Sequence, residues 1–154
     1  MTKTSRGKPS RSVARLNAVQ ALFQVEQSGD SVNSVIIQFL EHRLGQATDD
    51  DAPILKQPDT TLFSTLVQGT AGDLSQLDEL IAGYLDKSWS MERIQLVLKS
   101  ILRAATWELL HAKDTPTPVI INEYLDVTRA FYDDKEVGFV NGVLDKLARH
   151  IRPQ

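Results

Sequence analysis

A few polar side chains interrupt the apolar stretches of this 154-residue sequence, and they are the first candidates for chemistry. Asn122 and Glu123 form one such group, and Asn141 and Asp145 form another. A carboxylate in an apolar setting can serve as a general acid or base. Helical bundles also retain such groups by pairing them with a cation, and Arg103 stands inside an apolar run. The pattern favours a structural polar network of these five residues, with a ligand or partner surface as the alternative.

Few residues of the types that bind metals or attack substrates are present. The sequence has no cysteine, which excludes a disulfide framework, a zinc–thiolate site and a cysteine nucleophile. There is no G-x-S-x-G motif and no glycine-rich phosphate loop. The run Asp49-Asp50-Asp51 is more typical of a solvated stretch than of a cation site. The three histidines are not spaced to share one helical face: His42, His111 and His150. The sequence therefore predicts no catalytic residue, no metal site and no cofactor.

Charge is distributed unevenly along the chain. The formal net charge is −3, yet the first 25 residues carry five cations and no acid, which leaves −8 on the remaining 129 residues. The five cations are Lys3, Arg6, Lys8, Arg11 and Arg15. Residues 1–10, rich in Ser, Thr, Gly and Pro, have the composition of a flexible basic arm. Such an arm is typical of phosphate-backbone binding, and a solvated terminus is the alternative.

Helical periodicity accounts for the rest of the chain, and no alternating run indicates a strand. Apolar residues recur at three- and four-residue spacing in segments that we expect to begin at Ser12, Ser31, Thr60, Ser90, Thr117 and after the turn 133–136. The segment from Thr60 is one helix or two joined near Gly69 and Gly72, and the stretch 45–59 is an acidic loop. Trp89 and Trp107 are expected in the core. The prediction is an all-α fold of six or seven helices, arranged as two small packed bundles.

Localisation follows from what the sequence lacks. The basic first dozen residues lead into no apolar segment, and no run approaches the roughly 18 apolar residues of a membrane span. The absence of cysteine fits a reducing compartment. We expect a cytoplasmic protein that does not contact membranes.

Five short sequence words, in this order, resemble the NusB family of transcription antitermination factors. They are RSVAR at 11–15, AVQALF at 18–23, ILRAATWEL at 101–109, PVIINE at 118–123 and FVNGVLDK at 139–146. Together they span nearly the whole chain. The resemblance implies two small helical bundles that bind the single-stranded boxA element of nascent ribosomal RNA transcripts. It also implies a partner, the small-subunit ribosomal protein NusE, within an antitermination complex of other Nus factors and RNA polymerase.

The resemblance also suggests which residues contact RNA. The family's arginine-rich motif corresponds here to Arg11 and Arg15, and the turn before FVNG makes Lys135 and Phe139 candidates. Arg6 and Lys8, like Lys3, are added on charge alone. The sequence departs from the family pattern in two places: Ser12 and Val13 thin the arginine cluster, and the loop 45–59 is long and acidic.

The mechanism expected is binding without catalysis, by a single helical domain over residues 11–154. About four neutralised phosphates would give a slope of log K against log salt of roughly −2.8, which implies weak binding without a protein partner. One alternative is a helical protein–protein adaptor without specific RNA binding. Another is a stand-alone relative of the NusB-like domain of RNA methyltransferases, although the cofactor domain of such an enzyme would have to follow Gln154. The sequence leaves monomer and homodimer open.

Overall fold

The computed structural model describes residues 9–43, 57–86 and 88–153. The basic residues Lys3, Arg6 and Lys8, the expected helix end near Gly45 and the acidic loop up to residue 56 lie outside these ranges. The chain divides into two compact units, which we call the N-terminal unit (Met1–Gln68) and the C-terminal unit (Gly69–Gln154). The all-α prediction is confirmed, since the described residues form seven α-helices and no β-strand.

The N-terminal unit is built on α1 (Arg11–Ser28), α2 (Val32–Gln38) and most of α3 (Thr60–Gly72). A π-helical turn, η2 (Phe39–Arg43), continues α2. Small residues of α1 such as Ala14 and Ala18 are fully buried, and Phe39 stacks on Phe63 of α3 with ring centroids 5.6 Å apart. Gly29 ends α1 with a φ of 78°, a left-handed conformation that glycine adopts without steric cost.

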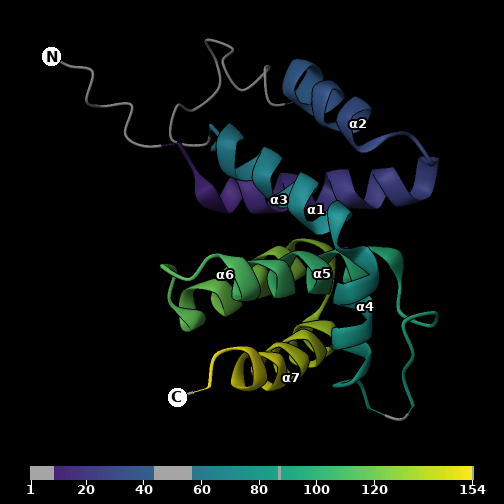
Figure 1. The fold of residues 1–154 in the computed structure, drawn as a ribbon, viewed down its shortest axis with the longest axis vertical. Coiled ribbons are helices and arrows are strands. Elements are labelled where there is room, and N and C mark those ends of the chain that lie inside the picture. The colour runs from purple at the N-terminus through teal and green to yellow at the C-terminus, as the bar shows by residue number, and fades with distance from the viewer. Residues whose placement is uncertain (1–8, 44–56, 87, 154) are drawn as a thin grey trace, which may run out of the picture. The chain divides into compact units, whose positions relative to one another are not determined.

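Two of the helix starts in this unit are tied together. The Ser10 amide donates to the carbonyl of Gln57 at 2.6 Å, and the Asp59 amide donates to the carbonyl of Ser10 at 2.9 Å. The Ser10 side chain accepts from the Val13 amide and caps α1, while the Asp59 carboxylate accepts from the Leu62 amide and caps α3. Figure 1 shows α1 and α3 beginning at the same end of the unit.

The C-terminal unit contains α4 (Leu74–Ala82), α5 (Leu96–His111), α6 (Thr117–Phe131) and α7 (Asp134–Ile151). The central helix is α5, which packs against α4, α6 and α7 (Figure 1). Residues 100–106 of α5 are buried around its whole circumference. A helix that is buried on all sides is expected at the centre of a bundle.

Gly69 allows a close approach within the C-terminal unit. A Cβ atom placed on Gly69 would overlap the indole of Trp107 on α5. The glycine therefore costs helix propensity but lets the end of α3 lie directly against the tryptophan ring. The helix break suspected near Gly72 is confirmed, because Asp73 separates α3 from α4.

Some expected helix starts were wrong. Ser10, not Ser12, caps α1, and α5 begins at Leu96 after a turn in which the Arg93 amide donates to the Ser90 carbonyl. Ser31 caps α2 as expected, with its hydroxyl accepting from the Ser34 amide at 3.1 Å. Thr117 is the first residue of α6, not its cap. No helix in the described part of the chain has the length and apolarity needed to cross a bilayer.

Candidate nucleic-acid interface

The start of α1 presents Arg11 on the surface of the N-terminal unit. The first turn of α1 holds no acidic side chain, so the partial positive charge of the helix N-terminus is not offset within the helix. The nearby Asp59 carboxylate is occupied in capping α3. An exposed guanidinium at an uncompensated helix start can pair with a phosphate.

Arg15 lies one turn further along α1 and is buried, with 2% of its surface exposed. Arg15 also makes an interaction of its own. This position argues against a direct contact between Arg15 and RNA, because the side chain would have to leave the interior to reach a phosphate. Arg6 and Lys8 lie outside the described residues. Arg11 is therefore the predicted N-terminal cation that the structure places on the surface.

The predicted residues at the start of α7 belong to the C-terminal unit. Lys135 is exposed, and Phe139 is half-buried one turn further along the helix. The Phe139 ring lies against Trp89, with ring centroids 5.0 Å apart and planes inclined by 40°. Trp89 is 37% exposed, so the expectation of a core position is wrong for this residue. The physical reason is that Trp89 stands in the turn before α5 and not on the inner face of a helix.

Tyr132, which sequence analysis did not single out, lies at the C-terminal end of α6. Burial raises the pKa of its phenol above the ordinary value of 10.0, and the negative charge of Glu136 raises it further. A hydrogen bond from the Leu98 backbone acts in the opposite direction. The phenol is therefore held in its neutral form at the point where α6 turns into α7.

The buried ion pair of the C-terminal unit differs from the predicted network. Arg103 donates two hydrogen bonds to Asp78 of α4, from Nε to Oδ1 and from Nη2 to Oδ2, both 2.7 Å long. The Arg103 and Asp78 side chains are 8% and 30% exposed. A second buried contact joins the Tyr124 hydroxyl to the Glu108 carboxylate at 2.6 Å. These contacts link α4 to α5 and α5 to α6.

Three other members of the predicted network lie on the surface, away from the buried Arg103. Asn122 and Asn141 are exposed, and Glu123 is half-buried. Asp145 pairs on the surface with Arg149 at 2.8 Å. Asn122, Asn141 and Asp145 therefore form no buried cluster with Arg103, because they lie on outward faces of α6 and α7. The sequence could have indicated Asp78 as a partner for Arg103, because Asp78 lies between the apolar residues Leu77 and Ile81.

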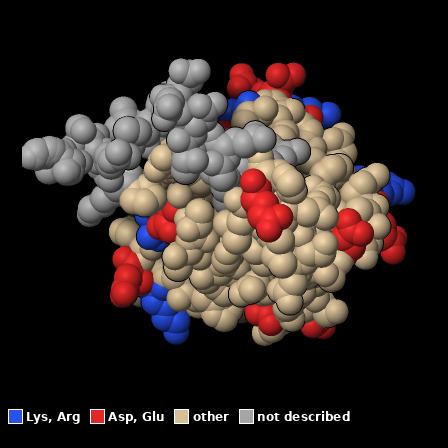
Figure 2. All heavy atoms as spheres, turned by 90° about the horizontal axis from the view of Figure 1, so that it is seen from above, with Lys and Arg blue, Asp and Glu red and all other residues tan. Residues whose placement is uncertain are grey.

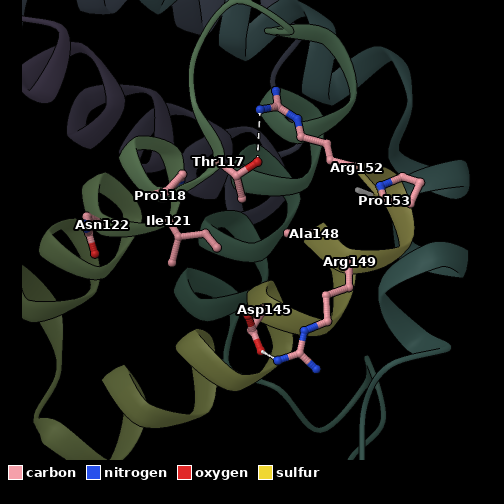
Figure 3. A pocket seen from close by; sticks show the side chains of 9 residues that line it. All are labelled: Thr117, Pro118, Ile121, Asn122, Asp145, Ala148, Arg149, Arg152 and Pro153. Carbon is pink, nitrogen blue, oxygen red and sulfur yellow. Dashed lines mark hydrogen bonds and ion pairs between the residues drawn. The ribbon is translucent and has the colours of Figure 1, made fainter.

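A groove of about 690 Å³ lies between α6 and the end of α7 (Figure 3). Its charged side chains are paired: Asp145 with Arg149, and Arg152 with the hydroxyl of Thr117. Within the described residues no three His, Asp or Glu side chains are grouped as a metal site would require. The groove therefore brings together no recognisable set of catalytic groups.

Charged side chains on the described surface are mixed in sign. Figure 2 shows Lys and Arg side chains in small groups among Asp and Glu side chains on this face. A nucleic-acid contact by the described residues would therefore rest on a few positioned groups. Arg11 in the N-terminal unit and the pair Trp89 and Phe139 in the C-terminal unit are such groups.

The fold places this chain among small all-helical proteins built from two bundles. Comparison with known proteins gives its family: the sequence pattern of the NusB family matches residues 12–149, and the chain belongs to that family. The transcription antitermination protein NusB of Sinorhizobium medicae (strain WSM419) is 39% identical over 157 residues, covering 99% of this chain and 97% of the relative.

Solved structures have the same fold. NusB of T. maritima superposes with a TM-score of 0.78 at 31% sequence identity, covering 95% of each chain. A chain from the complex of the antitermination factors NusB and NusE with double-stranded RNA superposes with a TM-score of 0.75 at 22% identity. That second match covers 91% of this chain and 96% of the other, and at this identity it concerns the fold alone.

Proposed function

We propose that this protein is a transcription antitermination factor that binds boxA RNA of nascent ribosomal RNA transcripts together with the ribosomal protein NusE. The observation that carries the proposal is membership of the NusB family over residues 12–149, with a relative named for antitermination that matches nearly the full length. The solved complex of NusB and NusE with RNA, which shares the fold, supports the same partners. Other Nus factors and RNA polymerase would complete the assembly.

The RNA-binding surface that we propose begins at Arg11 and extends to the basic residues Arg6 and Lys8 before it. In the C-terminal unit, Lys135 and Phe139 contribute a cation and an aromatic ring. Single-stranded RNA is bound by cations on its phosphates and by planar groups against its bases, and these residues supply both kinds of contact. The protein acts by binding in the cytoplasm and not by catalysis.

The charge distribution supports a basic protein partner. After the first 25 residues the chain carries a net charge of −8, which attracts a basic surface and speeds association with it. A ribosomal protein that binds RNA is basic on its RNA-contacting face and adds cations that this chain lacks. The partner would thus convert weak capture of RNA into tight capture.

The test is co-migration of the protein, NusE and a boxA RNA oligonucleotide as one complex at moderate salt. Arg11→Ala should weaken RNA binding and reduce the slope of log K against log salt by about 0.7, because one phosphate contact is lost. The matched control is Arg129→Ala, which removes an exposed arginine paired with Asp126 on α6. Unchanged binding of Arg11→Ala would refute the role of Arg11, and failure of the unmodified protein to bind boxA RNA, with and without NusE, would leave the protein–protein adaptor as the better explanation.

A further inference from the structure

The contact between Trp89 and Phe139 forms a two-ring aromatic surface in the C-terminal unit, which we call the aromatic pair. The two rings come from segments 50 positions apart and meet with centroids 5.0 Å apart. Trp89 is 37% exposed, which is unusual for a side chain with so much apolar surface to bury. An exposed tryptophan held against a second ring offers a flat face to a partner.

The turn that carries Trp89 is held in place on both sides. The Trp89 amide donates to the Asp86 carbonyl at 2.9 Å, and the Arg93 amide donates to the Ser90 carbonyl at 2.9 Å. Ile94, which follows the turn, is buried with 3% of its surface exposed. The turn therefore positions the indole before any partner binds, and binding carries a smaller entropy cost for ordering this side chain.

The surroundings of the aromatic pair select the kind of partner. Ser88, Ser90, Glu92 and Arg93 are all exposed and Met91 is half-buried, so the exposed neighbours of Trp89 along the chain are polar. A protein interface needs a larger continuous apolar area than one or two rings. A single planar base needs no more than an aromatic face, and base stacking on aromatic side chains is a common mode of binding unpaired RNA.

The charged residues next to the aromatic pair along the chain are net acidic. Lys135 lies four residues before Phe139 and hence on the same face of α7, while Asp134 and Glu136 occupy the same first turn. Arg93 and Glu92 are neighbours in the turn that carries Trp89. Affinity at this position would therefore come from stacking on the rings, with Lys135 supplying a local contact to phosphate.

We propose that Trp89, supported by Phe139, is the stacking platform for one unpaired base of the bound RNA. This inference rests on the proposed RNA-binding function and adds to it a residue that the sequence assigned to the core. Loss of one base–aromatic stack weakens binding by roughly five- to a hundred-fold. Trp89→Leu should show a loss in that range, and Trp89→Phe should retain most of the affinity because it keeps an aromatic face.

The matched control is Phe131→Leu. Phe131 is 38% exposed, nearly the same as Trp89, and it lies at the end of α6. This variant should bind boxA RNA as the unmodified protein does. Equal losses in Trp89→Leu and Phe131→Leu would overturn the proposal, since they would indicate a general effect of removing surface rings.

A spectroscopic experiment tests the contact without altering Trp89. The chain has two tryptophans, so Trp107→Phe leaves Trp89 as the single emitter. Stacking of a base should quench its fluorescence when boxA RNA and NusE are added, and inorganic polyphosphate should not. Quenching or a blue shift with NusE alone, unaffected by RNA, would assign Trp89 to a protein contact and overturn the proposal.

The binding and fluorescence measurements together distinguish the stacking platform from the RNA-binding function on which it rests. If Arg11→Ala weakens RNA binding while Trp89→Leu binds normally and Trp89 is not quenched, the stacking platform is refuted and the RNA-binding function stands. If the unmodified protein with NusE does not bind boxA RNA, both are refuted. Far-ultraviolet circular dichroism of Trp89→Leu checks its fold, and the Trp107→Phe fluorescence decides the matter should Trp89→Leu unfold.

Discussion

Replacement of Arg152 by alanine should destabilise the C-terminal unit far more than its place near the chain end suggests. The Arg152 guanidinium donates three short hydrogen bonds to backbone carbonyls, to Leu109 at 2.9 Å, Ala112 at 2.7 Å and Thr115 at 2.6 Å. It also makes longer bonds to the Glu108 carbonyl and to the Thr117 hydroxyl, the second of which Figure 3 shows. These carbonyls belong to the end of α5 and the loop to α6, where the regular helical hydrogen bonds end, although the Glu108 and Ala112 carbonyls also accept from the Ala112 and Thr115 amides.

The expected loss follows from the number of short bonds. A hydrogen bond involving a charged group contributes about 1.5 kcal/mol at the low end of its range, and there are three short ones. Ordering the arginine side chain costs up to about 2 kcal/mol. The net contribution of Arg152 is therefore about 2.5 kcal/mol, and Arg152→Ala should lower the free energy of unfolding by that amount.

The assay is urea unfolding followed by tryptophan fluorescence. Both tryptophans, Trp89 and Trp107, lie in the C-terminal unit, so the signal reports on the unit that holds Arg152. The matched control is Arg149→Ala, which removes an arginine that is 77% exposed and paired only on the surface with Asp145. Exposed ion pairs contribute about 0.2–1 kcal/mol, so this variant should change stability little.

A result in which Arg152→Ala and Arg149→Ala lose the same stability would refute the reasoning. It would mean that water satisfies the carbonyls at the end of α5 as well as the guanidinium does. Arg152→Lys provides a further check. The lysine ammonium keeps the charge but lacks the planar, forked guanidinium that donates to three carbonyls in different directions. The stability of Arg152→Lys should lie between those of Arg152→Ala and the unmodified protein.

Two further predictions concern stability. Gly69→Ala should lower the free energy of unfolding by about 1 kcal/mol, because overlap with Trp107 outweighs the gain in helix propensity, whereas Gly142→Ala on open α7 should raise it slightly in the same urea assay. The raised pKa of Tyr132 means that its phenol stabilises the fold fully below pH 10.0 and progressively less as pH rises through the pKa of the folded state. Tyr132→Phe should therefore lose less of its free energy of unfolding above pH 10.0 than the unmodified protein does. Parallel pH profiles would contradict this assignment.

The helices were predictable because their signals are local. The spacing of apolar residues and the cap at Ser31 act within one or two turns, and α2 begins where they indicate. The start of α1 was harder, since Ser10 and Ser12 are both good caps. Ser10 is used because its backbone pairs with Gln57 and Asp59, a contact that only the folded chain makes.

The candidate site was predictable in part. Arg11 and Lys135 are exposed, as a contact with RNA requires, whereas Arg15, one turn from Arg11, is buried. Arg103 pairs with Asp78 of α4, a carboxylate that the apolar context of α6 and α7 did not suggest. A cation inside an apolar segment of the sequence indicates that an acidic partner is needed. Several Asp and Glu residues of the chain could serve as that partner equally well.

By itself the sequence determined the helical class, the basic character of the first 25 residues and the family, since each depends on residue types and their order along the chain. Tertiary structure decided which residues meet: Trp89 with Phe139, Arg103 with Asp78, and Arg152 with the end of α5. The physical reason is the distance along the chain over which each interaction acts. Helix formation depends on neighbours within a few residues, whereas the choice between chemically equivalent partners depends on how distant helices pack.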